Sequence, residues 1–106
     1  MTSRIRPRQW TSCAAELRRL NRFLRGFDKL APAEQQEVLR ALEALLLHLN
    51  SRQPLRKGLG IKKLTRRHWE VRAGLSLRIV YDIADNLLRL ITVGNHNDVE
   101  RFLRNL

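Results

Sequence analysis

Two alternating runs around a short break constrain the fold of this chain more than any other feature. In WEVRAGLSLRIVY, Trp69 to Tyr81, apolar residues recur at every second position on both sides of Gly74-Leu75-Ser76. Side chains alternate between the faces of a strand, and two such runs joined by a short glycine-containing loop predict a β-hairpin. A three-residue loop pairs Trp69 with Tyr81 and places the apolar residues of both strands on one face.

The same register sets two arginines against each other. Arg72 falls directly opposite Arg78, and Glu70 lies diagonal to Arg78 on the same face. Like charges directly opposite on a sheet cost about 0.2–1 kcal/mol. One interpretation is that Glu70 neutralises Arg78 while Arg72 points into solvent. The other is an anion site, because two guanidiniums on rigid strands are suited to gripping phosphate through paired N–H donors.

The N-terminal half predicts helices. Apolar residues at steps of three and four from Trp10 to Phe27 indicate an amphipathic helix. A second helix is expected to begin at Leu30-Ala31-Pro32, where proline suits the first turn, and to end near Asn50-Ser51. The short connection between them predicts an antiparallel helical hairpin. Residues 1–9 are expected to form a short edge strand or a loose arm.

The C-terminal half predicts strands. They are expected over Ile61–Leu64, Trp69–Ala73, Leu77–Ile83 and Leu87–Val93, with a terminal helix over Val99–Leu106. Helices followed by strands indicate an α+β fold. With 106 residues, 43% of them hydrophobic, we expect one domain over residues 1–106. Its helical hairpin should cover one face of a mainly antiparallel sheet of three to four strands.

The charge predicts a polyanionic partner. Lys and Arg number 21 against 10 Asp and Glu, a net charge of +11, which favours nucleic acid, an anionic membrane surface or an acidic protein. A membrane-spanning helix is not expected, because the longest apolar run, Leu42 to Leu49, is far shorter than about 20 residues. The N-terminus lacks the apolar core of a secretory signal, so a cytoplasmic protein is expected. One cysteine and three scattered histidines exclude four-ligand zinc.

Four segments, in order and spacing, resemble the RelE/ParE superfamily of toxins of type II toxin–antitoxin systems. They are IKKL at Ile61–Leu64, WEVRAG at Trp69–Gly74, LRIVYDI at Leu77–Ile83 and VGNHNDV at Val93–Val99, preceded by two helices of the family's form.

The resemblance implies a RelE-like toxin that represses translation by binding messenger RNA in the ribosomal decoding site. RelE-like members cleave that RNA without a metal or other cofactor, by attack of the ribose 2′-hydroxyl on the adjacent phosphate. The implied partners are mRNA, the ribosome and a cognate antitoxin, which the charge of this chain predicts to be acidic or partly disordered. The ParE-like branch shares the fold but inhibits DNA gyrase. A basic nucleic-acid-binding module without catalysis is a third alternative.

The resemblance also implies roles for individual residues. Arg78 matches the arginine that stabilises the phosphate, and Arg72 matches a basic position in the preceding strand. His96 lies where members carry a group that protonates the leaving 5′-oxygen, a task that suits imidazole near neutral pH. Glu70 is either the general base or the counter-ion of Arg78. Active members carry a tyrosine near the C-terminus, a region that Phe102 or Leu103 occupies here.

A run of basic residues borders these positions and is expected to hold RNA backbone phosphates. It comprises Lys62 and Lys63, which fit the basic edge of the family, and Arg66, Arg67, Arg56 and Lys57 nearby.

Overall fold

A five-stranded sheet, in the order β1-β5-β4-β3-β2, forms the centre of this computed structural model. The structure describes residues 16–51, 60–85 and 87–106. Within those ranges, no helix is long and apolar enough to cross a membrane. The elements in chain order are β1 (Glu16–Arg19), α1 (Asn21–Asp28), α2 (Pro32–Ser51), β2 (Ile61–Lys63), β3 (Trp69–Ala73), β4 (Leu77–Ala84), β5 (Leu87–Gly94) and α3 (His96–Arg104).

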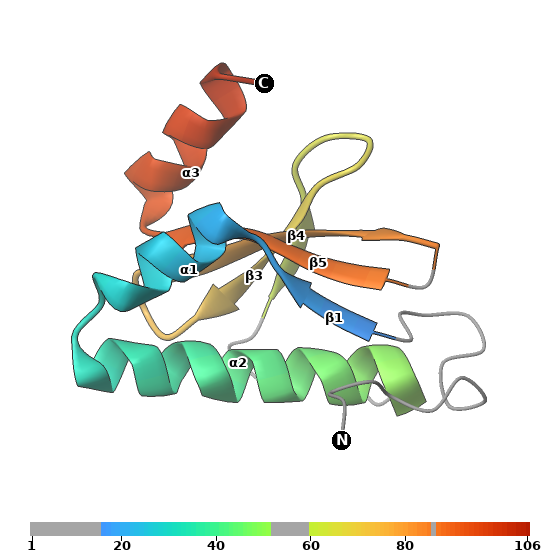
Figure 1. Cartoon of the computed structure of the whole chain (residues 1–106), viewed down its shortest axis with the longest axis horizontal. Coiled ribbons are helices and arrows are strands. Elements are labelled where there is room, and N and C mark those ends of the chain that lie inside the picture. The colour runs from blue at the N-terminus through green and yellow to red at the C-terminus, as the bar shows by residue number, and fades with distance from the viewer. Residues whose placement is uncertain (1–15, 52–59, 86) are drawn as a thin grey trace.

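The helices lie on both sides of the sheet. Figure 1 shows α2 running along one face, with α1 beside β5 and leading back into α2, while α3 rises on the opposite side. The α+β class is therefore confirmed, and so are the four antiparallel strands β2 to β5. The fifth strand, β1, is one more than expected.

The hairpin of β3 and β4 has the predicted register. Trp69 is paired with Tyr81, and Arg72 lies opposite Arg78. Gly74 begins the connecting turn with a φ of 70°, a backbone conformation that glycine adopts without the steric cost of a side chain. The alternation of apolar residues and the turn chemistry agree, which is why this part of the fold follows from the sequence.

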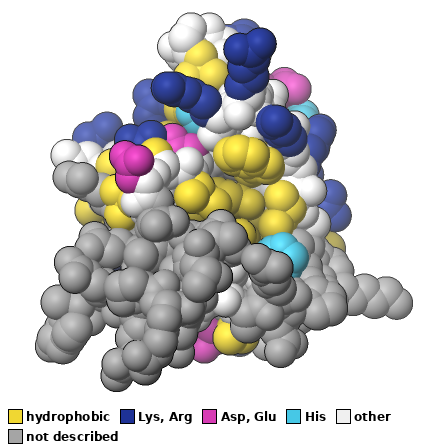
Figure 2. Space-filling view, turned by 90° about the vertical axis from the view of Figure 1, so that its right-hand side faces the viewer, with side chains coloured by type: hydrophobic (Ala, Val, Ile, Leu, Met, Phe, Trp, Pro, Cys, Tyr) yellow, Lys and Arg dark blue, Asp and Glu magenta, His cyan; other side chains and the backbone are white. Residues whose placement is uncertain are grey.

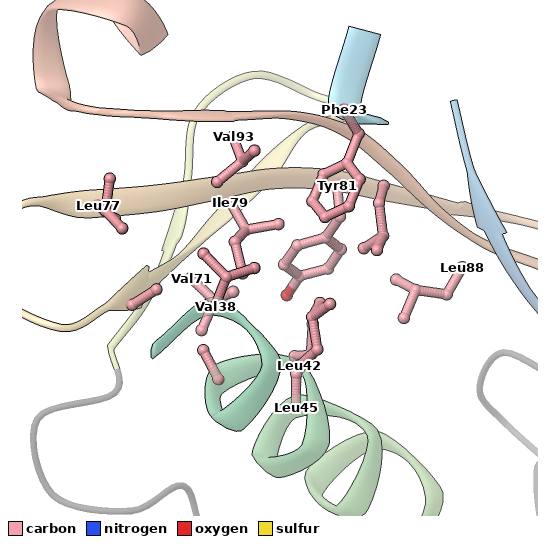
Figure 3. Close-up of a cluster of buried hydrophobic side chains, with 13 residues drawn as sticks. Phe23, Val38, Leu42, Leu45, Val71, Leu77, Ile79, Tyr81, Leu88 and Val93 are labelled. Atoms are coloured by element: carbon pink, nitrogen blue, oxygen red, sulfur yellow. The ribbon is translucent and has the colours of Figure 1, made fainter. Parts of the chain in front are cut away.

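The main core lies between α2 and the sheet. Val38, Leu42 and Leu45 recur at helical spacing and are buried against Val71 and Ile79 of the central strands (Figure 3). Phe23 of α1 belongs to the same cluster, so both helices cover the same face of the sheet. Proline at the first position of α2 is compatible with the helix because its missing N–H would have no partner there.

The predicted helix from Trp10 to Phe27 is confirmed over residues 21–27 and wrong over residues 16–19. Residues 16–19 form β1, which pairs in parallel with β5, and α1 begins only at Asn21. Without β1, one side of β5 would present unpaired N–H and C=O groups at that edge of the sheet. This pairing outweighs the local helical pattern. Residues 10–15, and the strand or arm expected over residues 1–9, lie outside the described residues.

The terminal helix begins three residues earlier than predicted, at His96 instead of Val99. The Asn95 side chain accepts a hydrogen bond from the Asp98 N–H, and the Asp98 carboxylate accepts one from the Asn95 N–H, each at 2.9 Å. This reciprocal arrangement is a capping box, which satisfies two backbone donors at the start of the helix. It therefore fixes where α3 begins.

Candidate anion-binding site

The face of the sheet opposite α2 carries a line of charged side chains. Lys62 of β2 is paired with Glu70 of β3, and Arg72 with Arg78 of β4. Cross-strand partners share a face, and the alternate residues of the same strands point into the core beneath α2. Arg78 is also paired with Gly94 at the end of β5. The predicted pairing of Arg72 with Arg78 across the two strands is therefore confirmed.

Arg78 is held in place by Glu70. The Arg78 Nε atom lies 3.3 Å from Glu70 Oε2, and only 16% and 13% of the two side chains are exposed. The Arg78 Nη1 atom is buried and has no hydrogen-bond partner among the described residues. A buried donor without a partner costs about 1–3 kcal/mol. Glu70 thus balances the charge of Arg78 but leaves one buried guanidinium donor without a hydrogen-bond partner among the described residues.

Arg72 differs from its neighbour in that it is exposed. It forms no ion pair with any residue in the described ranges. Together with Lys62, the two arginines leave this part of the face positive after Glu70 has been counted. The arrangement can attract an anion through Arg72 and hydrogen-bond it through Arg78. Figure 2 shows other Lys and Arg side chains over the upper part of the molecule, on the side of the sheet where α3 lies.

His96 lies at the same end of the sheet but is not held against the arginines. It follows Gly94, the partner of Arg78, by two residues and opens α3. Its Nε2 atom lies 3.1 Å from Glu100 Oε2, one turn further along the helix, and 64% of its side chain is exposed. The imidazole is therefore near the site along the chain, and no packing fixes its orientation.

The expected basic edge is divided by the strand geometry. Lys62 shares the face of Glu70, whereas Lys63 is paired with Trp69 on the other face, with its Nζ atom 5.6 Å from the indole ring centre. Arg66 and Arg67 are exposed in the turn between β2 and β3. Of the two lysines in β2, Lys62 therefore faces the same way as the arginine pair and Lys63 does not. Arg56 and Lys57 lie outside the described residues.

A second ion pair on this face was missed by sequence reasoning. Arg89 of β5 donates two hydrogen bonds to the buried Asp82 of β4, Nε to Oδ1 at 2.7 Å and Nη2 to Oδ2 at 2.5 Å. The hydrogen bond to Asp82 raises the pKa of the Arg89 guanidinium. The sequence signal that could have revealed this pair was the opposite charge of two residues on either side of the β4–β5 turn. Because both charges are paired, this site offers less to an anion than Arg78 does.

Helix α3 covers the middle of this face. Phe102 and Val99 pack on Val80, and the His68 ring meets Phe102 edge-on at 5.4 Å between ring centres. Phe102 is 9% exposed, so the aromatic ring in the region of the family's tyrosine serves packing here. The charged site lies beside this small second core.

The chain matches the model of a known family. Residues 11–100 match the family described as ParE toxin of type II toxin-antitoxin system, parDE. A search of curated proteins gave no match.

Several solved structures share the fold. A copper-bound mutant toxin from Helicobacter pylori is 23% identical, with a TM-score of 0.61, and the alignment covers 79% of this chain and 97% of that one. The RelB-RelE antitoxin-toxin complex from Methanococcus jannaschii gives 15% identity and a TM-score of 0.60, with 80% and 96% covered. The toxin-antitoxin complex RelBE2 from Mycobacterium tuberculosis gives 26% identity and a TM-score of 0.56, with 76% and 96% covered.

Proposed function

Because the chain belongs to the ParE toxin family of type II toxin–antitoxin systems, we propose that it arrests growth by cleaving messenger RNA on the ribosome. The observation that carries this proposal is the unpaired Nη1 donor of Arg78, which is buried and becomes available only if the side chain turns, beside the exposed Arg72. A phosphodiester in the RNA backbone supplies the acceptor oxygens that this donor lacks. Such an activity places the protein in the cytoplasm, where ribosomes are.

The proposed chemistry needs no group beyond this chain and the RNA. The ribose 2′-oxygen attacks the adjacent phosphorus, the bond from phosphorus to the 5′-oxygen breaks, and a 2′,3′-cyclic phosphate remains. Arg78 donates to a non-bridging oxygen, where negative charge builds up in the transition state. Glu70 accepts the 2′-hydroxyl proton, and His96 turns from Glu100 to protonate the departing 5′-oxygen. Arg72 and Lys62 hold the neighbouring backbone.

Arg78→Ala tests the proposal directly. Induced expression of the variant should no longer arrest growth, and mapping of transcript ends should show no cuts within translated messages. Arg78→Lys should also lose at least about tenfold in cleavage, because it keeps the charge but not the planar pair of donors. Arg104→Ala, which removes an exposed arginine from the end of α3, is the matched control and should cleave normally. Unchanged cleavage by an Arg78→Ala protein with a normal unfolding transition would remove Arg78 from the mechanism.

Glu70→Gln distinguishes base from counter-ion. The amide keeps a hydrogen-bond acceptor toward Arg78 but cannot take up the 2′-hydroxyl proton. Loss of a general base lowers the cleavage rate by about 10²–10⁴-fold. A fall of less than tenfold would assign Glu70 to the counter-ion role alone.

Inhibition of DNA gyrase is the second candidate, and two observations favour it. The matched family is described by ParE, and Phe102, near the position of the missing tyrosine, is buried against Val80. Intact transcripts together with an induced DNA-damage response would select this alternative. Harmless expression of the folded protein would instead select a nucleic-acid-binding module without toxicity.

The proposed partner is a cognate antitoxin with an acidic, partly disordered segment. Two of the solved structures that share the fold are toxin–antitoxin complexes. The net charge of +11 favours an acidic surface on the antitoxin of this chain.

A further inference from the structure

The second positive site of the molecule is a cavity beside Gly94, the cross-strand partner of Arg78. It has a volume of about 340 Å³ and opens between α1, the end of β5 and α3. Four cationic side chains line it, and neither Glu70, Arg72 nor Arg78 does. The four are Arg22, Arg25, Lys29 and Arg101.

Among the described residues that line the cavity, Asp98 is the only carboxylate, and it already has partners. Its Oδ2 atom accepts the Asn95 backbone N–H at 2.9 Å, and its Oδ1 atom accepts from Arg101 Nη1 at 3.2 Å. Arg25 and Lys29 form no ion pair with any residue of the described ranges. Four positive charges therefore face one carboxylate that is engaged in capping α3.

The ends of the helices explain only part of this charge. Arg25 and Arg101 lie in the last turns of α1 and α3, where a cation is favoured by the partial negative charge of the helix terminus. Arg22 lies in the first turn of α1, where the same effect disfavours a cation. Its guanidinium is held 5.4 Å from the centre of the Phe102 ring, at the wall of the cavity. Helix electrostatics do not account for that placement.

Two glycines that line the cavity allow a close approach of its walls. A side-chain carbon at Gly26 of α1 would lie 2.7 Å from the Val93 carbonyl oxygen, and one at Gly94 would lie 2.5 Å from Asp98 Oδ2. Both glycines line the cavity. The close approach of α1 and α3 to β5 therefore gathers cations from two helices around one space.

We propose that this cavity binds a phosphate-bearing ligand with at least two negative charges. Arginine guanidiniums present paired donors that match phosphate oxygens, and three of the four cations are arginines. A phosphate monoester, a diphosphate or two adjacent backbone phosphates would balance the excess positive charge. A single carboxylate of an acidic protein would leave most of that positive charge unbalanced. The inference goes beyond the proposed cleavage and does not depend on it, since the cavity shares none of the arginine-pair residues.

Inorganic pyrophosphate is the first probe. In an NMR titration of the full chain, the backbone amide signals of Gly26, Gly94 and Asn105 should shift in a saturable way. Arg25→Ala with Lys29→Ala should weaken this binding at least about tenfold. The control pair, Arg40→Ala with Arg104→Ala, removes the same charge from exposed positions outside the cavity and should change it less than about twofold. Absence of shifts at the cavity, or equal losses in both pairs, would overturn the proposal.

Two further arms identify the source of the phosphate and the alternative occupant. A short RNA with a 5′-phosphate that binds the cavity more tightly than the same RNA with a 5′-hydroxyl would assign the site to a terminal phosphate. Equal binding of the two RNAs would assign it to the backbone. An acidic peptide that displaces pyrophosphate as readily as RNA does would overturn phosphate selectivity. Arg78→Ala should leave the saturable shifts of Gly26 and Asn105, which do not pair with Arg78, intact, so failure of the cleavage proposal can be told apart from failure of this one.

Discussion

Single residues show how this fold exposes or withholds its charged groups. The Arg78 side chain is mostly buried, yet its Nη1 atom has no partner in the described part of the chain. A purely structural ion pair would be expected to satisfy this donor, because an open one lowers stability. Arg89, by contrast, uses two of its donors on Asp82. Arg78 therefore retains an unused donor, whereas Arg89 is committed to an ion pair within the sheet.

Tyr81 gives a prediction at the scale of one residue. Its ring is 3% exposed and stacks near Trp69, and burial raises the pKa of its phenol from 10.0 to about 12. The stability due to the neutral phenol is complete below about pH 10 and is lost as the pH rises through 12. A shift of this size corresponds to about 2–3 kcal/mol.

The measurement is urea unfolding of wild type and Tyr81→Phe between pH 7 and pH 12. Wild type should lose more unfolding free energy above pH 10 than the variant, which has no phenol to ionise. Parallel losses in the two proteins would show that other groups, such as lysines, cause the alkaline decrease.

At the scale of elements, the approach of α1 to β5 decides the shape of the second cavity. Glycine inside a helix usually costs about 0.5–1 kcal/mol relative to alanine. Gly26 is an exception, because an added side-chain carbon would meet the backbone oxygen of Val93 at 2.7 Å. Backbone cannot move aside as the tip of a flexible side chain can. Helix α1 therefore depends on this glycine for its position on the sheet.

Gly26→Ala should lower the free energy of unfolding by about 1–2 kcal/mol, because the clash exceeds the gain in helix propensity. The matched control is Gly60→Ala, where an added side-chain carbon meets nothing within 4 Å, and it should change stability by less than about 0.5 kcal/mol. Thermal and urea unfolding measure both. Stabilisation by Gly26→Ala would mean that α1 can move away from β5 at little cost.

At the scale of the whole molecule, the excess of positive charge determines how partners are recognised. The chain carries +11, and cations lie both around the arginine pair and around the second cavity. So much charge of one sign opposes compaction and accelerates encounters with polyanions. The binding of an acidic antitoxin would reduce the self-repulsion.

Affinity for the cognate antitoxin should accordingly fall with salt. Between about 0.1 M and 0.5 M NaCl, calorimetry should show at least about a tenfold increase in Kd, mostly through slower association. An antitoxin whose affinity is constant over this range would be held chiefly by apolar contacts. An uncharged osmolyte at equal osmotic strength serves as the control.

Sequence reasoning succeeded where the signal was local. The β3–β4 register follows from alternation on both sides of a glycine turn, so Glu70, Arg72 and Arg78 could be placed on one face. β1 was missed because its partner, β5, lies at the other end of the chain, and no local pattern reports that pairing. The second cavity was missed for a similar reason, since Arg22 and Asp98 meet only after α1 and α3 have docked on β5.

The parallel pairing of β1 with β5 also bears on when the fold can be completed. Residues 16–19 find their partners only at residues 87–90, so this edge closes over a long intervening segment. Contacts so distant in sequence form late, because the entropy of closing the loop must be overcome first. During synthesis, the apolar side chains of α2 can be buried only after the same strands have been made. A chain whose C-terminal strands have not yet left the ribosome therefore cannot complete the fold of the toxin.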